Sequence, residues 1–284
     1  MKKSTITMAT ACSSTSTTSI EWDPSALVRP ASSSGKQFAL IVLNQPLQNH
    51  QGVIHTLWDN AAIRIAADGG ANCLFDVAGK QGDASLDDLD VIIGDLDSLS
   101  PTARSYFENP DPSSPRKPTQ VIHDHDQYST DFGKAVHHVR HNYHHSSSPS
   151  QPLDIIAVGG LGGRVDQGLS QLHHLYLFQS SPTYAEGRMY LFSGESLTFL
   201  LKAGSHKIRV RSPGQPDVFG KYVGILPTKE PSRITTKGLE WDVADWETEF
   251  GGQVSTSNHV LPETEVIEVE TTKDVIFTIA LRQA

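Results

Sequence analysis

A short apolar run ends in a glycine and two carboxylates in the stretch Val91-Ile92-Ile93-Gly94-Asp95-Leu96-Asp97-Ser98. The β-branched run predicts a strand that is buried on both faces, as in a parallel sheet. Because open α/β sheets bind ligands at the carboxyl ends of their strands, we expect Asp95 and Asp97 to face a crevice. Carboxylates this close suit Mg²⁺ carrying a phosphate-bearing substrate. A helix N-cap at Asp97 or Ser98 explains the same residues equally well.

The composition of the chain limits the classes of function. The 284 residues are enough for two domains, and 23 basic against 32 acidic residues give a net charge of −9. Since there is no basic stripe, a nucleic-acid partner is not expected. The cysteines, Cys12 and Cys73, form no CxxC pair and predict a reducing, cytoplasmic compartment. No apolar run approaches the ~20 residues of a membrane span, so no membrane partner is expected.

Three segments of the chain differ in pattern. Residues 1–36 are rich in Ser and Thr, which predicts a disordered tail whose removal changes neither stability nor activity. Residues 37–194 alternate apolar strands with helical stretches and predict a mostly parallel α/β domain. Residues 195–284 hold short alternating segments and predict an antiparallel β domain, either a sandwich or a barrel. The predicted fold class is α/β followed by all-β.

The first domain is predicted in more detail from its apolar runs. Strands are expected at residues 38–43, 63–66, 90–93, 119–122, 153–158 and 189–192. Helices are expected near residues 71–78, 101–107, 131–143 and 167–178. The Pro- and Ser-rich residues 109–118 and 144–152 are expected to form surface loops.

A polar cluster follows most of the expected parallel strands. Any one cluster is ordinary turn chemistry, since Asp-Gly and Gly-Gly are common turn formers. Parallel strands place their carboxyl ends on one edge of a sheet, so five such clusters favour a single site there. The clusters are Asn44-Gln45, Asp68-Gly69-Gly70, Asp95 to Asp97, Asp124 to Asp131 and Gly159 to Asp166.

Two of these clusters have features of binding sites. The glycines between Val158 and Asp166 allow backbone N–H groups to approach an anion, but they lack the third glycine of a dinucleotide fingerprint. No Walker loop is present either, so another device must hold any phosphates. Thr130 is suited to cap a helix that follows it.

His137 and His141 have the spacing of a metal pair without a carboxylate or cysteine partner, which favours a solvated helix end.

Six motifs, in order from about Phe38 to the end of the chain, make the sequence similar to the eukaryotic, fungal-like thiamine pyrophosphokinases. Each motif is weak alone, and their common order is specific. Many bacterial relatives have His after Arg-x-Asp, where Gln167 stands here. The motifs are Asp68-Gly69-Gly70-Ala71-Asn72, Gly94-Asp95-x-Asp97-Ser98, Asp126-Gln127-x-x-Thr130-Asp131-x-x-Lys134, Gly162-Gly163-Arg164-x-Asp166-Gln167, Thr236-x-Gly238-Leu239-x-Trp241 and Ser255-Thr256-Ser257-Asn258.

The resemblance implies a homodimer with shared active sites that transfers the diphosphate of ATP to the hydroxyethyl group of thiamine, giving thiamine diphosphate and AMP. Mg²⁺ and positioning would contribute most of the catalysis. The implied catalytic residues are Asp68, Asp95, Asp97 and Asp131. The last three are implied as metal ligands, and Asp68 is the next candidate, either for the metal or for the incoming hydroxyl. The implied substrate contacts are Gln127, Arg164, Asp166, Gln167, Trp241, Ser257 and Asn258, and the implied nucleotide contacts are Asn72, Thr130, Lys134, Gly162 and Gly163.

Two other classes of function fit part of this pattern. Phosphatases of the haloacid-dehalogenase type also place Asp-x-Asp after an apolar strand, with the first Asp as nucleophile, although Gly94 intervenes here. A non-catalytic thiamine or nucleotide sensor is the other alternative, and the retention of every motif carboxylate argues against it. Thiamine-dependent release of AMP from ATP separates the three hypotheses.

Overall fold

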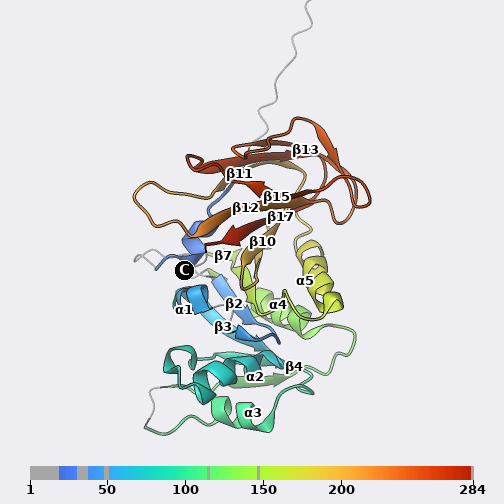
Figure 1. The fold of residues 1–284 in the computed structure, drawn as a ribbon. Helices are drawn as coiled ribbons and strands as arrows, with labels where there is room; N and C mark the ends of the chain where they lie inside the picture. The colour runs from blue at the N-terminus through green and yellow to red at the C-terminus, as the bar shows by residue number, and fades with distance from the viewer. Residues whose placement is uncertain (1–18, 31–37, 48–50, 114–115, 146–147, 283–284) are drawn as a thin grey trace, which may run out of the picture.

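The computed structural model describes residues 19–30, 38–47, 51–113, 116–145 and 148–282. Within them, one large sheet holds the strands in the order β15-β12-β17-β10-β9-β8-β2-β3-β4-β5 (Figure 1). Its parallel part consists of β2 (Phe38–Val42), β3 (Ala61–Ala67), β4 (Val91–Gly94), β5 (Gln120–His123), β8 (Asp154–Val158) and β9 (Met189–Phe192). Its antiparallel part consists of β10 (Ser196–Leu201), β12 (Phe219–Leu226), β15 (Ser255–His259) and β17 (Val275–Leu281).

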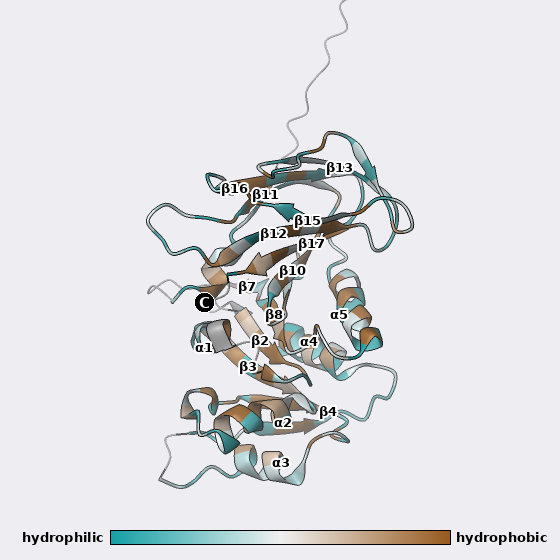
Figure 2. Ribbon diagram, viewed as in Figure 1, coloured by the Kyte–Doolittle hydropathy of each residue, from teal (hydrophilic) through white to brown (hydrophobic). Residues whose placement is uncertain are grey.

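Helices cover both faces of the parallel strands. The alternation of side chains along β2 shows this, because Leu40 and Val42 pack into one core and Ala39 and Ile41 into the other. The first core also takes residues of α1 (Gln51–Asn60), α2 (Gly70–Phe75) and α3 (Pro101–Glu108). The second core takes residues of α4 (Asp131–Asn142) and α5 (Val165–Leu177). The apolar central strands therefore lie between two helical layers, as Figure 2 shows.

A second sheet packs on the antiparallel part of the first. Its order is β1-β11-β16-β13-β14, with β1 (Ile20–Trp22), β11 (Gly204–Arg209), β16 (Val266–Thr271), β13 (Ser232–Lys237) and β14 (Trp246–Thr248). Ile208 and Ile267 from this sheet share one core with Phe199 and Phe277 from the large sheet. The β-rich part is therefore a sandwich, an alternative that the sequence pattern left open beside a barrel.

The expected strands and helices of the first domain are confirmed, with ends that differ by a few residues. Helix α1 was not predicted, although Val53, Ile54, Leu57 and Trp58 have the spacing of one apolar helix face. The expected surface loop at 144–152 instead contains the short strands β6 (His144–His145) and β7 (Ser148–Pro152), which pair with each other. None of the helices described is long and apolar enough to span a membrane.

The expectation of a disordered tail is wrong for residues 19–30. Strand β1 pairs in parallel with β11, and a helical turn follows at Pro24–Val28. Trp22 is 2% exposed, lies 4.6 Å from the ring of Phe199 and donates a hydrogen bond of 3.0 Å from Nε1 to Nδ1 of His206. The buried side chains of Trp22, Leu27 and Val28 are enough to order this short segment, because the core into which they pack is built by distant strands. Residues 1–18 and 31–37 lie outside the described structure.

We expect Trp22→Ala to lower the free energy of unfolding by about 3–5 kcal/mol, because a buried indole leaves a large cavity and an unpaired His206. Urea denaturation measures this change. Glu21→Ala, on the exposed face of the same strand, is the matched control and should change stability by no more than about 0.5 kcal/mol. Equal stability of the two variants would show that the segment does not contribute to the core.

Candidate active site at the carboxyl ends of the parallel strands

The polar clusters of the sequence meet at one edge of the sheet, as expected. Strands β8, β2, β3, β4 and β5 are parallel neighbours, so the residues that follow them lie side by side. Asp68 follows β3, Asp95 follows β4, and Asp131 begins α4 after β5. One carboxylate oxygen from each of the three lies within 4.8 Å of the others. We call this group the acidic cluster.

Gly94 makes this approach possible. A Cβ atom at residue 94 would lie 2.6 Å from Cβ of Asp68 and 3.0 Å from Oδ1 of Asp131. Any larger residue would therefore push the two carboxylates apart. The last residue of β4, the strand between β3 and β5, thus sets the spacing of the site.

Asp68 is the most buried member of the acidic cluster, at 2% exposure. Its Oδ2 accepts a bond of 3.0 Å from the backbone N–H of Ser98, whereas its Oδ1 is buried without a partner among the described residues. Burial raises the pKa of this carboxyl, and the charges of Asp131 and Asp95 raise it further, against the bond from Ser98. The ionised group therefore favours a bound cation.

The acidic cluster fits a hard divalent cation. Carboxylate oxygens are the ligands that Mg²⁺ prefers, and the unpartnered oxygen of Asp68 is a free ligand position. The metal set expected from the sequence was Asp95, Asp97 and Asp131. The structure places Asp68 in the group and Asp97 outside it, exposed, with its N–H bonded to Oδ1 of Asp95 at 3.1 Å. The role of Asp97 as a ligand stays a prediction.

The start of α4 is held by a partner that sequence analysis missed. Oγ1 of Thr130 accepts the N–H of Gly133 at 3.0 Å and lies 2.8 Å from Nε2 of His174 on α5. Burial lowers the pKa of His174, so its imidazole is neutral. Since Nδ1 faces the carbonyl of Ser170, Nδ1 carries the proton and Nε2 accepts the hydroxyl of Thr130. No local pattern could reveal this pair, which is 44 residues apart.

Lys134 supplies a cation beside the acidic cluster. Its side chain is buried, and its Nζ lies 3.4 Å from Oδ1 of Asp131, one turn earlier on α4. Because a buried ammonium needs a charged partner, this pair fixes both side chains near the strand ends. Lys134 is therefore placed to meet a negatively charged ligand at the cluster.

The glycine-rich loop follows β8, which lies two strands from β3 along the same edge of the sheet. Gly163 has a φ of 65°, and a Cβ there would lie 2.6 Å from Oε1 of Gln45, which follows β2. Arg164 and Asp166 form an exposed ion pair of 2.6 Å. Gln127 and Gln167 are exposed as well. All four expected substrate contacts of the α/β part are thus open to a ligand.

The expected residues of the β-rich part lie far from this edge. Trp241 is 55% exposed, and Ser257 is exposed with a φ of 55°. Asn258 is buried, with its amide bonded to the N–H and the carbonyl of Trp241 at 3.1 and 2.9 Å. Strand β15 stands eight positions from β4 in the large sheet, about 40 Å along the sheet at ~4.8 Å per strand. Asn258 therefore holds Trp241, and neither joins the acidic cluster within one chain.

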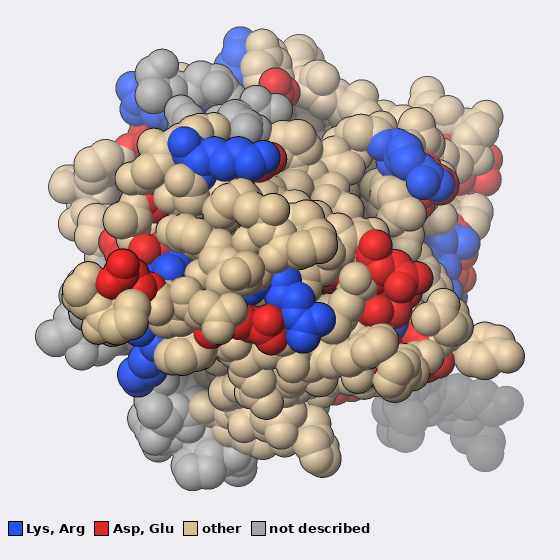
Figure 3. Space-filling view, turned by 90° about the horizontal axis from the view of Figure 1, so that it is seen from below, with Lys and Arg blue, Asp and Glu red and all other residues tan. Residues whose placement is uncertain are grey.

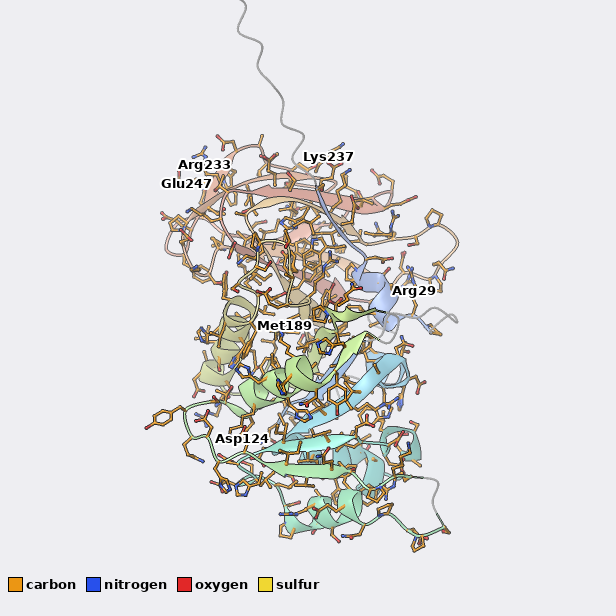
Figure 4. The ribbon with its side chains drawn as sticks, turned by 180° about the vertical axis from the view of Figure 1, so that it is seen from behind. Arg29, Asp124, Met189, Arg233, Lys237 and Glu247 are labelled. Atoms are coloured by element: carbon orange, nitrogen blue, oxygen red, sulfur yellow. The ribbon has the colours of Figure 1, made fainter. Side chains whose placement is uncertain are left out.

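The views of the whole molecule agree with this separation. Figure 4 shows Asp124, which follows β5, at the opposite end from Arg233, Lys237 and Glu247 of the second sheet. On the face seen in Figure 3, acidic and basic side chains are interspersed without a continuous basic stripe. The surface drawn there shows no charge pattern typical of a nucleic-acid interface.

Comparisons with known proteins point in one direction. A model of the thiamin pyrophosphokinase catalytic domain matches residues 54–185, and a model of the thiamin pyrophosphokinase vitamin B1 binding domain matches residues 205–276. Thiamine pyrophosphokinase 3 of Oryza sativa is 36% identical over 87% of this chain and 88% of its own length. Thiamine pyrophosphokinase of Saccharomyces cerevisiae is 26% identical over 85% of each.

Solved structures agree with the sequence comparisons. Thiamin pyrophosphokinase from Candida albicans superposes with a TM-score of 0.72 at 25% identity over 93% of each chain. The yeast enzyme superposes with a TM-score of 0.73 at 25% identity over 93% of this chain and 91% of its own. The arrangement of an α/β part followed by a β-rich part is thus shared with both.

We expect Asp68→Asn to raise the Tm of the metal-free protein by a few degrees at pH 8. The raised pKa means that the folded state disfavours the ionised carboxyl, and the amide removes that cost while it still accepts the N–H of Ser98. Below pH ~3.9 the carboxyl is protonated in both states, so the difference should shrink as the pH falls toward 4. Thermal denaturation in EDTA measures it, and Asp59→Asn on the exposed side of α1 is the control. A lower Tm of Asp68→Asn at pH 8 would contradict the inference that the ionised carboxyl of Asp68 destabilises the metal-free protein.

Proposed function

Because this chain belongs to the thiamine pyrophosphokinase family, we propose that the acidic cluster of Asp68, Asp95 and Asp131 is the centre of its diphosphate transfer. The protein is an enzyme that diphosphorylates thiamine with ATP. The hydroxyl of the thiamine hydroxyethyl group loses its proton to solvent, and its oxygen bonds to the β-phosphorus of ATP. The bond from that phosphorus to the oxygen that bridges to the α-phosphorus breaks, and AMP leaves with this oxygen. The observation that carries the assignment of the site is the convergence of three carboxylates at the strand ends.

We propose that Asp68, Asp95 and Asp131 hold Mg²⁺. A divalent cation held there would offset the negative charge on the phosphoryl groups that are transferred. The unpartnered oxygen of Asp68 and the raised pKa of its carboxyl support this set. Asp97, one residue beyond Asp95, is exposed and is a further candidate ligand.

The remaining residues of the edge are proposed to bind and orient the two substrates. Lys134 is placed for a phosphate oxygen of ATP, since its ammonium is already held beside the acidic cluster. Arg164, braced by Asp166, is proposed to contact phosphates as well. The other proposed nucleotide contacts are Thr130, Gly162 and Gly163, and the other proposed substrate contacts near this edge are Gln127 and Gln167.

We further propose that the active site is shared between two copies of the chain. Trp241, Ser257 and Asn258 are expected to form the thiamine side, yet about 40 Å of sheet separates β15 from β4. A two-fold dimer can bring the β-rich part of one copy to the acidic cluster of the other. An exposed indole suits the face of a flat cationic ring.

Helix α5 offers a surface for the second copy. Val165, Leu169 and Leu177 are 77%, 61% and 54% exposed on this helix. Leu169 and Leu177 also line a groove of about 460 Å³ that reaches Thr228 of the β-rich part. The helix stands at the level between the β-rich part and the end formed by α2 and α3 (Figure 1). An apolar face in this place favours a partner that bridges the two parts.

Two organisational proposals accompany the function. The boundary between the domains is proposed near residue 195, between the residues that the two family models match. The large sheet continues across it, because β10 pairs with β9. A cytoplasmic location is proposed from the cysteine usage of the sequence, because Cys12 and Cys73 form no CxxC pair and indicate no disulfide framework.

We expect Asp95→Asn to lower kcat by a factor of about 10³ or more, because an amide keeps the shape of the side chain but removes a charged ligand. Thiamine-dependent release of AMP from ATP at saturating Mg²⁺ measures it. Asp59→Asn is the control on the exposed side of α1 and should retain activity. Phosphate release without AMP would indicate a phosphatase, and near-normal turnover of Asp95→Asn would remove the acidic cluster from the mechanism.

We expect Asp95→Asn and Trp241→Ala, each inactive alone, to complement each other when co-expressed. In a mixed dimer one composite site collects both defects and the other has none. Random assortment makes half of the dimers mixed, so about a quarter of the wild-type activity per site should return, as two-fold symmetry requires. Asp95→Asn with Asp131→Asn is the matched control, because both changes lie on the same half of the site and should not complement. Absence of recovery in purified mixed dimers would rule out the shared site.

A further inference from the structure

The loop that carries Asp95 is held in an unfavourable backbone conformation. Leu96, between the two aspartates, has a φ of 64°, in the left-handed region that favours glycine. Its side chain is half-buried and packs against the first core, so the residue cannot be exchanged for glycine without loss of packing. A leucine remains in this region only when the surroundings hold the loop.

Four hydrogen bonds from outside the loop hold it, and the longest joins the N–H of Asp95 to Oδ1 of Asp131 at 3.4 Å. Ser98 donates its N–H to Oδ2 of Asp68 at 3.0 Å. The side chain of Asn72, on α2, donates from Nδ2 to the carbonyl of Ser98 at 2.7 Å and accepts at Oδ1 from the N–H of Ser100 at 2.9 Å. A primary amide can donate to a carbonyl from its nitrogen and accept an N–H at its oxygen at the same time. Asn72 therefore holds the C-terminal end of the loop by bonding the backbone of both Ser98 and Ser100.

The hydrogen bonds of Asn72 also fix the start of helix α3. Ser100 caps this helix by accepting the N–H of Ala103 at Oγ, and Pro101 follows it. Pro101 restricts Ser100 to an extended backbone, which matches its ψ of 143°. The loop is thus anchored at Gly94 by the sheet and at Ser100 by Asn72, with the strained Leu96 between the two anchors.

We propose that Asn72 is a positioning residue, which through its bonds to Ser98 and Ser100 keeps Leu96 in its left-handed conformation and Asp95 aimed at Asp68 and Asp131. The inference rests on the proposed function, which makes the acidic cluster the catalytic centre. It differs from the role expected from the sequence, a direct contact to the nucleotide. A positioning residue acts on the arrangement of the carboxylates, so its loss affects kcat more than substrate affinity.

The test compares Asn72→Ala with the full-length wild type in two measurements. Hydrogen exchange of the peptide that covers residues 95–100 should become at least about tenfold faster, because two of its four external hydrogen bonds are lost. In the assay of AMP release, kcat should fall by about 10–100-fold, while the KM values for ATP and thiamine change by no more than about twofold. If Asn72→Ala does not fold, Asn72→Ser, which keeps one polar group, is measured in the same way.

The strain at Leu96 provides a second variant. Asn tolerates the left-handed region better than Leu, so Leu96→Asn combined with Asn72→Ala should slow the exchange of the loop and recover part of kcat. A residue that only supports the fold would not be rescued at this position. The rescue is therefore specific to the proposed link between Asn72 and Leu96.

Two results would overturn the proposal. A large rise in the KM for ATP with unchanged exchange of the loop would make Asn72 a nucleotide contact. Faster exchange throughout the chain without rescue by Leu96→Asn would reduce it to general support of the fold. Loop exchange is measured on the protein without substrates, so a failure of the proposed function would show in the wild-type assay and leave this measurement interpretable.

Discussion

Repulsion among three carboxylates is the constraint on which the rest of the α/β part depends. Asp68, Asp95 and Asp131 bring their oxygens within 4.8 Å of one another, and one of them is almost fully buried. Like charges at this separation repel, and the single ammonium of Lys134 beside Asp131 offsets only part of the repulsion, so the fold must hold them there. The buried parallel strands do so from below, and Gly94 leaves the room that the side chains need.

The loops and helix ends around the acidic cluster are built to keep this arrangement. Two asparagines act in the same way at distant places, since Asn72 bonds the backbone of Ser98 and Ser100 and Asn258 bonds the backbone of Trp241 on both sides. His174 holds the hydroxyl that caps α4. Polar side chains that look like ligand contacts in a motif are thus engaged with the protein itself, and they act on ligands through what they position.

The continuous sheet explains why the molecule divides its functional residues between two ends. Strands β10, β17, β12 and β15 extend the parallel sheet on the side away from β4 and β5, and the second sheet packs on them. Trp22 joins this sandwich from the N-terminal segment, where Trp22, Leu27 and Val28 are buried. The exposed apolar face of α5 lies beside both parts, and this position supports the proposal that a second copy of the chain completes each site.

Local patterns determined the strands, most helices and the edge on which the site lies, because a buried strand needs an unbroken apolar run and parallel strands share their carboxyl ends. The spacing of Asp95 and Asp97 predicted a cation site, because two carboxylates one residue apart suit a divalent cation. Only the tertiary structure decided that Asp68 lies together with Asp95 and Asp131, that His174 partners Thr130, and that Trp22 is buried. Each of these depends on contacts between residues tens of positions apart, and periodicity along the chain carries no information about such distances.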